Sequence, residues 1–193
     1  MFYWTVCFIL SILARLRYRV KISGTEHIPA KGAFIMCSNH IHSYDPAMLA
    51  AFIKRRLVFM AKKELFYNPA KGWFFRKMGA FPVDRGAADI TSYRNAMQAL
   101  KSGMGLLIFS QGTKMQQLDI KSAKGGVALF GVKAKVPVIP AGISGSYRLF
   151  SPINIRFGPA ISLEEHYGGK LKAEHIEVIM TKIMSQVEKL LDP

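Results

Sequence analysis

The chain has 193 residues, of which 50% are hydrophobic and 20% are charged. This length is enough for one domain with a full apolar core, and the composition excludes a disordered, collagen-like or low-complexity chain. Lysine and arginine number 27 against 12 aspartates and glutamates, and the net charge of +15 predicts a polyanionic partner. The two cysteines, Cys7 and Cys37, lie inside apolar runs without metal-ligand spacing, so we expect neither a disulfide scaffold nor a metal site.

Residues 1–14 carry no charge and are rich in aromatic and aliphatic side chains. As a helix this run would be about 21 Å long, too short to span a hydrocarbon core of about 30 Å. Basic residues follow the run instead of preceding it, which is not the pattern of a signal peptide. We therefore predict a membrane-associating helix over residues 1–21, followed by one domain over residues 22–193. The alternative is an ordinary core helix.

From residue 21 onward, short apolar runs alternate with helical patterns. We expect strands over residues 33–37, 57–61, 80–83, 105–109 and 138–143, and an edge strand over residues 153–157. We expect helices over residues 46–53, 68–78, 90–101, 126–135 and 172–191. At the first of these helices we expect Asp45 as the N-cap and Pro46 as the first helical residue. The alternation predicts an α/β fold with a largely parallel sheet flanked by helices, preceded by a short N-terminal membrane-anchoring helix.

Polar residues follow three of the predicted strands, in residues 38–46, 84–86 and 110–114. Sites in open α/β sheets form at the carboxyl ends of strands. On a helix, His40 and Asp45 would be about 140° apart, but a turn between strand and helix can fold the imidazole onto the carboxylate. Such a carboxylate fixes the tautomer and leaves the other ring nitrogen as a base. The alternatives are a capping aspartate beside a surface histidine, or His42 as the base.

No G-x-S-x-G motif occurs, and neither cysteine lies in a polar loop, so a protein nucleophile is not expected. The base would then activate a substrate hydroxyl directly. The loop of residues 110–114 offers backbone N–H groups, the Thr113 hydroxyl and the Lys114 ammonium, and Arg85 adds a guanidinium; these are the groups that bind phosphate. A Walker-type phosphate loop is absent from the sequence, so nucleotide hydrolysis is not predicted. The alternative for each loop by itself is a polar turn.

These residues resemble the 1-acylglycerol-3-phosphate acyltransferases of the glycerolipid acyltransferase superfamily, whose four motifs occur here in order. The matching residues are Asn39, His40 and Asp45, followed by residues 79–85, 109–114 and 136–140. The third motif is usually Phe-Pro-Glu-Gly-Thr-Arg and is altered here to Phe-Ser-Gln-Gly-Thr-Lys. Residues 61–66 also look like the family, and the resemblance runs from about residue 24 to residue 157.

The resemblance implies that His40 is a general base on the acceptor hydroxyl, that Asp45 orients it, and that the acyl donor is a thioester. It implies a phosphate clamp of Arg85, Gly112, Thr113 and Lys114. The complete expected set of substrate-binding residues is Asn39, Arg85, Gln111, Gly112, Thr113 and Lys114. The implied reaction forms phosphatidic acid from 1-acyl-sn-glycerol 3-phosphate, with no cofactor other than acyl-CoA or acyl-carrier protein as co-substrate. The alternatives are another lipid alcohol or glycerol phosphate as acceptor, or a non-catalytic lipid-binding protein.

The basic charge has two expected uses. It would dock the chain on an anionic membrane surface, and it would attract acidic acyl-carrier protein or the phosphates of coenzyme A. No nucleic-acid-binding motif is present, so a nucleic-acid partner is not expected. We expect the chain at the cytoplasmic face of a membrane, such as a bacterial inner membrane.

Overall fold

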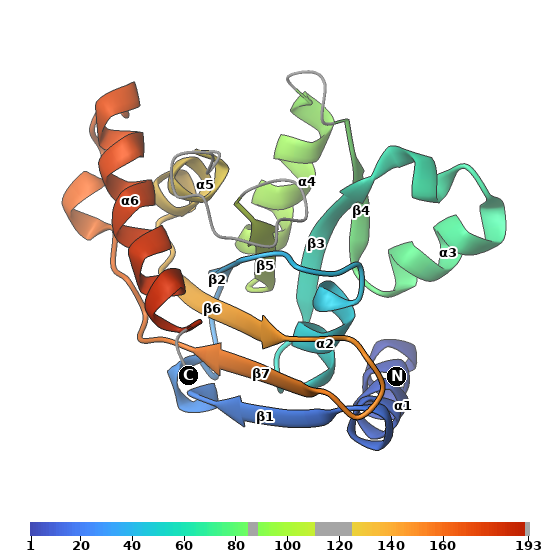
Figure 1. The fold of residues 1–193 in the computed structure, drawn as a ribbon. Helices are drawn as coiled ribbons and strands as arrows, with labels where there is room; N and C mark the ends of the chain where they lie inside the picture. Colours follow the sequence, from blue (N-terminus) through green and yellow to red (C-terminus); the bar gives the residue numbers. More distant parts are fainter. Residues whose placement is uncertain (85–88, 111–124, 192–193) are drawn as a thin grey trace.

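The computed structural model describes residues 1–84, 89–110 and 125–191. Its centre is a seven-stranded sheet in the order β1-β7-β6-β2-β5-β3-β4. The strands are β1 (Arg19–Ser23), β2 (Phe34–Ser38), β3 (Leu57–Lys62), β4 (Ala80–Val83), β5 (Gly105–Phe109), β6 (Val138–Gly145) and β7 (Pro152–Phe157). The five adjacent strands from β4 to β6 are parallel to one another, while β7 is antiparallel to β6 and parallel to β1. The predicted α/β fold with a largely parallel sheet is therefore confirmed (Figure 1).

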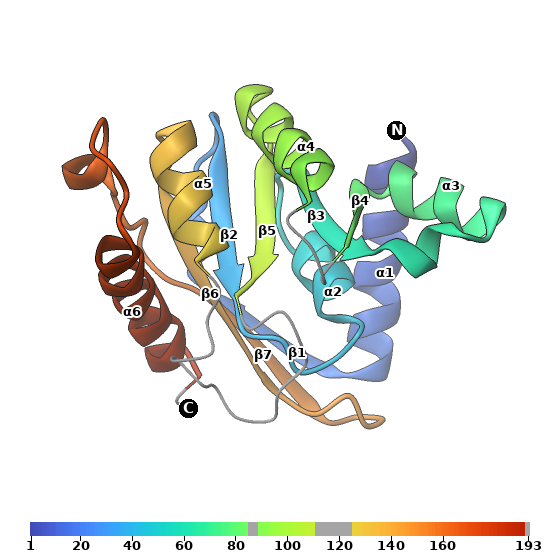
Figure 2. The ribbon, with the colours of Figure 1, turned by 90° about the horizontal axis from the view of Figure 1, so that it is seen from above.

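Helices cover both faces of the sheet. They are α1 (Phe2–Arg17), α2 (Asp45–Ala51), α3 (Pro69–Lys77), α4 (Ile90–Lys101), α5 (Gly126–Ala134) and α6 (Ala173–Lys189). One apolar cluster joins α4, α5 and α6 to one face, and a second joins α2 and the end of α1 to the other. Figure 2 shows the two layers on either side of the strands. Helix α3 lies beyond the β4 edge (Figure 1).

Three details differ from the sequence predictions. Strand β1 was not predicted, because the outward-facing charges Arg19 and Lys21 alternate with the half-buried Val20 and Ile22. Strand β7 is not an edge strand, because β1 pairs along its outer side. Helix α2 begins at Asp45 and not at residue 46, so Asp45 is the first helical residue and not the N-cap.

The N-terminal helix has two contrasting faces. Its buried residues recur at helical spacing and are small or polar apart from one ring: Tyr3, Cys7, Ser11 and Ala14. The Tyr3 hydroxyl accepts a hydrogen bond of 3.1 Å from the Leu57 N–H group, which ties the start of α1 to the start of β3. The predicted boundary after residue 21 falls inside β1. Helix α1 is therefore packed into the domain on one side.

The other face of α1 is apolar and exposed. Its exposed side chains include Phe8, Ile9, Ile12, Leu13 and Leu16. At the beginning of the helix, the Phe2 ring packs edge-on against Trp73 of α3, with centroids 5.4 Å apart. Within the described residues, no helix combines the length and the apolar character that crossing a membrane requires.

Candidate active site

The first motif lies at the carboxyl end of β2, in the turn that leads into α2. Nδ1 of His40 lies 2.7 Å from Oδ2 of Asp45, so the predicted pair is present. The same oxygen accepts hydrogen bonds of 2.7 Å from the backbone N–H groups of Ile41 and His42. The Asp45 side chain thus caps the turn that precedes it instead of the helix that follows it. This turn is the reason that two residues five positions apart meet.

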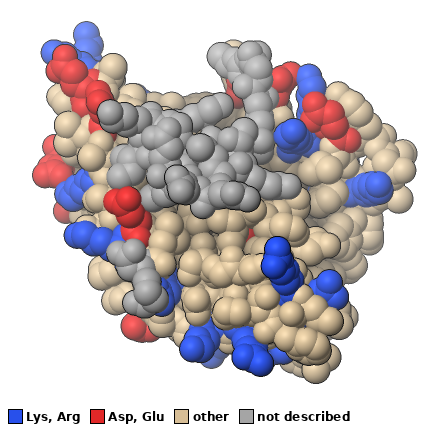
Figure 3. All heavy atoms as spheres, in the orientation of Figure 1, with Lys and Arg blue, Asp and Glu red and all other residues tan. Residues whose placement is uncertain are grey.

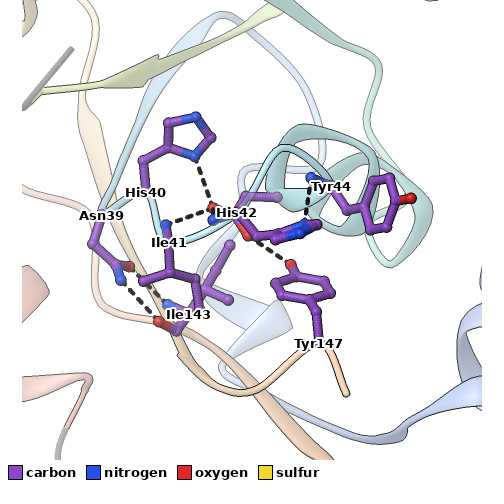
Figure 4. A network of polar contacts seen from close by, with 8 residues as sticks. Asn39, His40, Ile41, His42, Tyr44, Ile143 and Tyr147 are labelled. Atoms are coloured by element: carbon purple, nitrogen blue, oxygen red, sulfur yellow. Dashed lines mark hydrogen bonds and ion pairs between the residues drawn. The ribbon is translucent and has the colours of Figure 1, made fainter. Parts of the chain in front are cut away.

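Asp45 is fully buried, and its second oxygen is occupied as well. Oδ1 accepts a hydrogen bond of 2.6 Å from the hydroxyl of Tyr147, in the loop between β6 and β7. The carboxylate is therefore hydrogen-bonded to both the His40 imidazole and the Tyr147 phenol, two rings that Figure 4 labels. A buried carboxylate with donors on both oxygens is compensated and has one orientation.

The His40 ring is fixed by stacking as well as by hydrogen bonding. It lies against the ring of Phe109, at the end of β5, with centroids 4.2 Å apart and planes 24° from parallel. Its side chain is 11% exposed. With Nδ1 directed at Asp45, Nε2 points away from the carboxylate (Figure 4). The arrangement presents Nε2 as the basic nitrogen.

The competing histidine is placed differently. The ring of His42 stacks on Tyr147 at 4.4 Å, and its Nδ1 accepts a hydrogen bond of 3.2 Å from the Tyr44 N–H group. Its side chain contacts Tyr44 and Tyr147, and His42 reaches the carboxylate through its backbone N–H group. The geometry therefore favours His40 over His42 as the base.

Asn39 joins two strands. Its amide N–H donates to the Ile143 carbonyl oxygen and its amide oxygen accepts from the Ile143 N–H group, both at 2.8 Å. The residue is 4% exposed, so these bonds extend the pairing of β2 with β6 past Ser38. A substrate-binding role for Asn39 stays a prediction; the structure gives its side chain a scaffolding role directly behind His40.

The second motif is described up to Asp84. Gly79, which opens it, has a φ of +86°, and a Cβ there would lie 2.6 Å from the Leu57 carbonyl oxygen, so only glycine fits this turn into β4. At the end of β4, Asp84 pairs with Lys63 at 2.5 Å, and this contact raises the pKa of the lysine. The backbone N–H group of Asp84 donates to the Asp89 carboxylate, which also caps α4 by accepting from the Ser92 N–H group.

The predicted phosphate clamp falls on residues outside those that the structure describes. The clamp residues are Arg85, Gly112, Thr113 and Lys114, and the further predicted substrate-binding residue Gln111 also lies outside the described ranges. Their roles stay predictions. The described residues on either side of them, at the ends of β4 and β5, lie at the same edge of the sheet as His40.

Ser110, the second residue of the third motif, is buried. Its hydroxyl oxygen lies 2.8 Å from the Cys37 sulfur. Burial raises the pKa of the Cys37 thiol to about 12, against the opposing effect of the Ser110 hydrogen bond. Such a thiol is neutral and inaccessible, and Cys37 is therefore a poor nucleophile, as the sequence predicts.

Tyr147 was missed in the sequence. The predicted strand over residues 138–143 ends two residues before β6 does, and the loop after β6 lies outside the three polar loops that the sequence predicts at this edge. The signal in the sequence is the segment Ser144-Gly145-Ser146-Tyr147, which directly follows the strand predicted over residues 138–143.

Comparison with known proteins adds independent evidence. A family model described as Acyltransferase matches residues 19–144. The 1-acyl-sn-glycerol-3-phosphate acyltransferase of Streptococcus pneumoniae is 31% identical over 175 residues, which cover 86% of this chain and 64% of that protein. The enzyme of the same name from Bacillus subtilis is 33% identical over 137 residues, covering 70% of this chain and 68% of the relative. The chain thus spans about two thirds of the length of these relatives.

The fold comparison agrees. The crystal structure of the 1-acyl-sn-glycerophosphate acyltransferase PlsC from Thermotoga maritima superposes with a TM-score of 0.75 at 24% identity, covering 97% of this chain and 79% of that one. The matched segment contains the His40–Asp45 pair, the second motif and the fourth motif. The family predicted from the four motifs is confirmed, and the chain belongs to the acyltransferase family.

Proposed function

We propose that this protein transfers an acyl group from a thioester, either acyl-CoA or acyl-carrier protein, to the free hydroxyl of 1-acyl-sn-glycerol 3-phosphate, giving phosphatidic acid. The observation that carries the proposal is the fixed His40–Asp45 pair, with Nδ1 of His40 on the carboxylate and Nε2 directed away from it. The names of the relatives supply the acceptor.

The chemistry follows from the ring nitrogen left for the substrate. Nε2 of His40 takes the proton of the acceptor hydroxyl while its oxygen attacks the thioester carbonyl. The tetrahedral intermediate collapses, the carbon–sulfur bond breaks, and the imidazolium returns the proton to the leaving thiolate. Asp45 stabilises the imidazolium while it exists. The products are the ester and a free thiol, and no acyl-enzyme is required.

Arg85, Gly112, Thr113 and Lys114 are the proposed clamp for the phosphate of the acceptor. Lys63 supplies a further positive charge at the same edge of the sheet, where its ammonium is paired with Asp84 at the end of β4. Lys114 cannot bind the phosphate through two parallel N–H groups as the arginine usual at this motif position would, and a second cation near the phosphate would offset that loss.

The protein is further proposed to act on the surface of an anionic membrane. The apolar face of α1, defined by Phe8, Ile9, Ile12, Leu13 and Leu16, lacks a partner among the described residues and stays exposed. The basic residues that follow it are Arg15, Arg17, Arg19 and Lys21, all exposed. Figure 3 shows lysine and arginine side chains along the lower border of the molecule in that view, below β7 and toward α1. Apolar side chains beside basic ones suit the boundary between acyl chains and anionic headgroups.

The reaction is tested with a panel of acceptors and donors. The purified chain is incubated in vesicles with lysolipids that differ in headgroup, using acyl-CoA and acyl-carrier protein as donors, and the products are identified by mass. We expect phosphatidic acid from 1-acyl-sn-glycerol 3-phosphate as the main product. A product with another headgroup would move the activity to a different lipid alcohol, and the absence of any acylated product would contradict the proposal.

A further inference from the structure

Tyr147 reaches the active site from a loop whose position is fixed at both ends. Strand β6 runs parallel to β2, so its carboxyl end delivers this loop to the edge of the sheet where His40 lies. Gly145 has a φ of +110°, and a Cβ there would lie 2.1 Å from the Pro152 carbonyl oxygen, so the turn out of β6 requires glycine. Farther along the loop, the Phe150 N–H group donates to the Arg17 carbonyl oxygen at 2.8 Å.

The Tyr147 ring is held on two sides. His42 stacks against it at 4.4 Å, and the edge contact with Tyr18 has centroids 5.6 Å apart and planes at 86°. Tyr18 is the buried C-cap residue of α1, and its hydroxyl accepts a hydrogen bond from the Arg17 guanidinium. The phenol is therefore positioned by the turn after β2 and by the end of α1. These ring contacts keep the Tyr147 hydroxyl directed at the Asp45 carboxylate.

The phenol is the donor in its bond with Asp45. Burial and the nearby Asp45 charge raise the pKa of Tyr147 well above its usual range, so the hydroxyl keeps its proton. The oxygen–oxygen distance of 2.6 Å is that of a charge-assisted hydrogen bond. Oδ2 of the same carboxylate accepts hydrogen bonds from His40 and from two backbone N–H groups, while Oδ1 accepts one from Tyr147.

We propose that Tyr147 is a positioning residue for acyl transfer, a third member of the His40–Asp45 pair. Its hydroxyl fixes the rotation of the carboxylate, so that Oδ2 stays aimed at Nδ1 of His40. It also draws part of the negative charge toward Oδ1, which weakens the stabilisation of the imidazolium and sets the basicity of Nε2. The proposal rests on the proposed function only for its kinetic part.

The charged and titratable neighbours define what a pH readout reports. The groups that face Tyr147 are His42 and Tyr44 from the turn and the start of α2, Tyr18 from the end of α1, and Asp45 itself. Removing the hydroxyl leaves all of these rings in place. The negative charge of Asp45 then concentrates on Oδ2, which favours the protonated imidazole of His40. The acid limb of the pH–rate profile should therefore move to higher pH.

The test replaces the hydroxyl and keeps the ring. Tyr147→Phe should lower kcat about 10-fold, with both KM values changing less than about 2-fold, because the loss concerns alignment and not substrate binding. Tyr147→Leu, which also removes the ring contacts, should lose more. Tyr167→Phe is the matched control, a tyrosine hydroxyl removed near the start of α6, and should leave the kinetics unchanged.

A second readout needs no substrate. The NMR titration midpoint of the His40 ring is compared in the wild-type protein and in Tyr147→Phe, and we expect it to rise in the variant but not in Tyr167→Phe. An unchanged kcat and an unchanged midpoint in Tyr147→Phe would overturn the proposal. A wild-type chain that acylates none of the lysolipids would contradict the proposed function, while the midpoint would still decide whether Tyr147 tunes the imidazole.

Discussion

The Asp45 carboxylate accepts a hydrogen bond from Nδ1 of His40 at 2.7 Å. Two residues five positions apart on a regular helix would point about 140° away from each other and could not make this contact. The turn of residues 41–44 brings them together, because Oδ2 of Asp45 also accepts from two backbone N–H groups of that turn. The carboxylate that orients the base thus also builds the turn that positions it.

This double role predicts different results for two substitutions of Asp45. In Asp45→Asn, the amide oxygen can take the place of Oδ2, and the amide N–H can donate to the Tyr147 oxygen, so the free energy of unfolding should fall by only about 1–2 kcal/mol. The activity should still fall strongly, because a neutral amide does not stabilise the imidazolium. Asp45→Ala orphans the donors of the turn and should destabilise by more than about 3 kcal/mol. Chemical denaturation and kcat distinguish these outcomes; equal stability losses would contradict the account of the turn.

Asn39 should matter mainly for stability. Asn39→Ala leaves the buried N–H and carbonyl groups of Ile143 without partners, so we expect a loss of about 2–4 kcal/mol in the free energy of unfolding. Asn39→Asp should be similarly costly, because it places an oxygen against the Ile143 carbonyl. Asn154→Ala, in the partly exposed part of β7, is the control and should cost less than about 1 kcal/mol. A stable Asn39→Ala protein with a raised KM would instead support a substrate contact.

The acid end of the stability profile should depend on Asp89. Hydrogen bonds from Ser92 and from the Asp84 N–H group lower the pKa of Asp89 to about 2. Because the folded pKa lies below that of the unfolded chain, its stabilising effect is complete above pH of about 4 and decreases as the pH falls toward 2. Asp89→Asn keeps an N-cap but cannot titrate, so the stability of this variant should decline less over that interval. Denaturation at several pH values checks this; parallel profiles for the two proteins would contradict it.

Membrane binding should depend on the exposed face of α1. Deletion of the helix would also remove the buried Tyr3 and its bond to β3, so substitutions are the sharper test. The double variant Phe8→Glu, Leu16→Glu replaces side chains that are 66% and 69% exposed, and it should stay in the supernatant when anionic vesicles are sedimented. Val178→Glu, at a position on α6 that is 63% exposed, is the control and should sediment like the wild type. Equal sedimentation of all three proteins would place the membrane contact elsewhere, with the aromatic residues of α3 as the next candidates.

Much of the fold was predictable because its signals are local. Buried strands such as β2 and β5 are continuous apolar runs, and Asn68 and Asp89 cap their helices within three residues. Strand β1 was missed because an outer strand keeps charges on its exposed side, so its apolar alternation is short. The partner across β7 depends on which strand closes the sheet, and no local pattern determines that.

The site shows the same division. His40 and Asp45 were predictable because the pair lies within one turn and matches a family motif. Tyr147 lies 102 positions from Asp45, and its role depends on the parallel pairing of β2 with β6, which the sequence does not display. The scaffolding bonds of Asn39 were missed for the same reason, since its partner on β6 is 104 positions away.

The most direct test of the central claim compares wild type and His40→Ala in the transfer of an acyl chain to 1-acyl-sn-glycerol 3-phosphate. His40→Ala should lower kcat by roughly 10²- to 10⁴-fold, with little change in the KM of the acceptor, because a positioned base acts in the transition state and not in binding. His27→Ala, a histidine at the surface away from the pair, is the control and should match the wild type. Near-full turnover by His40→Ala would contradict the account.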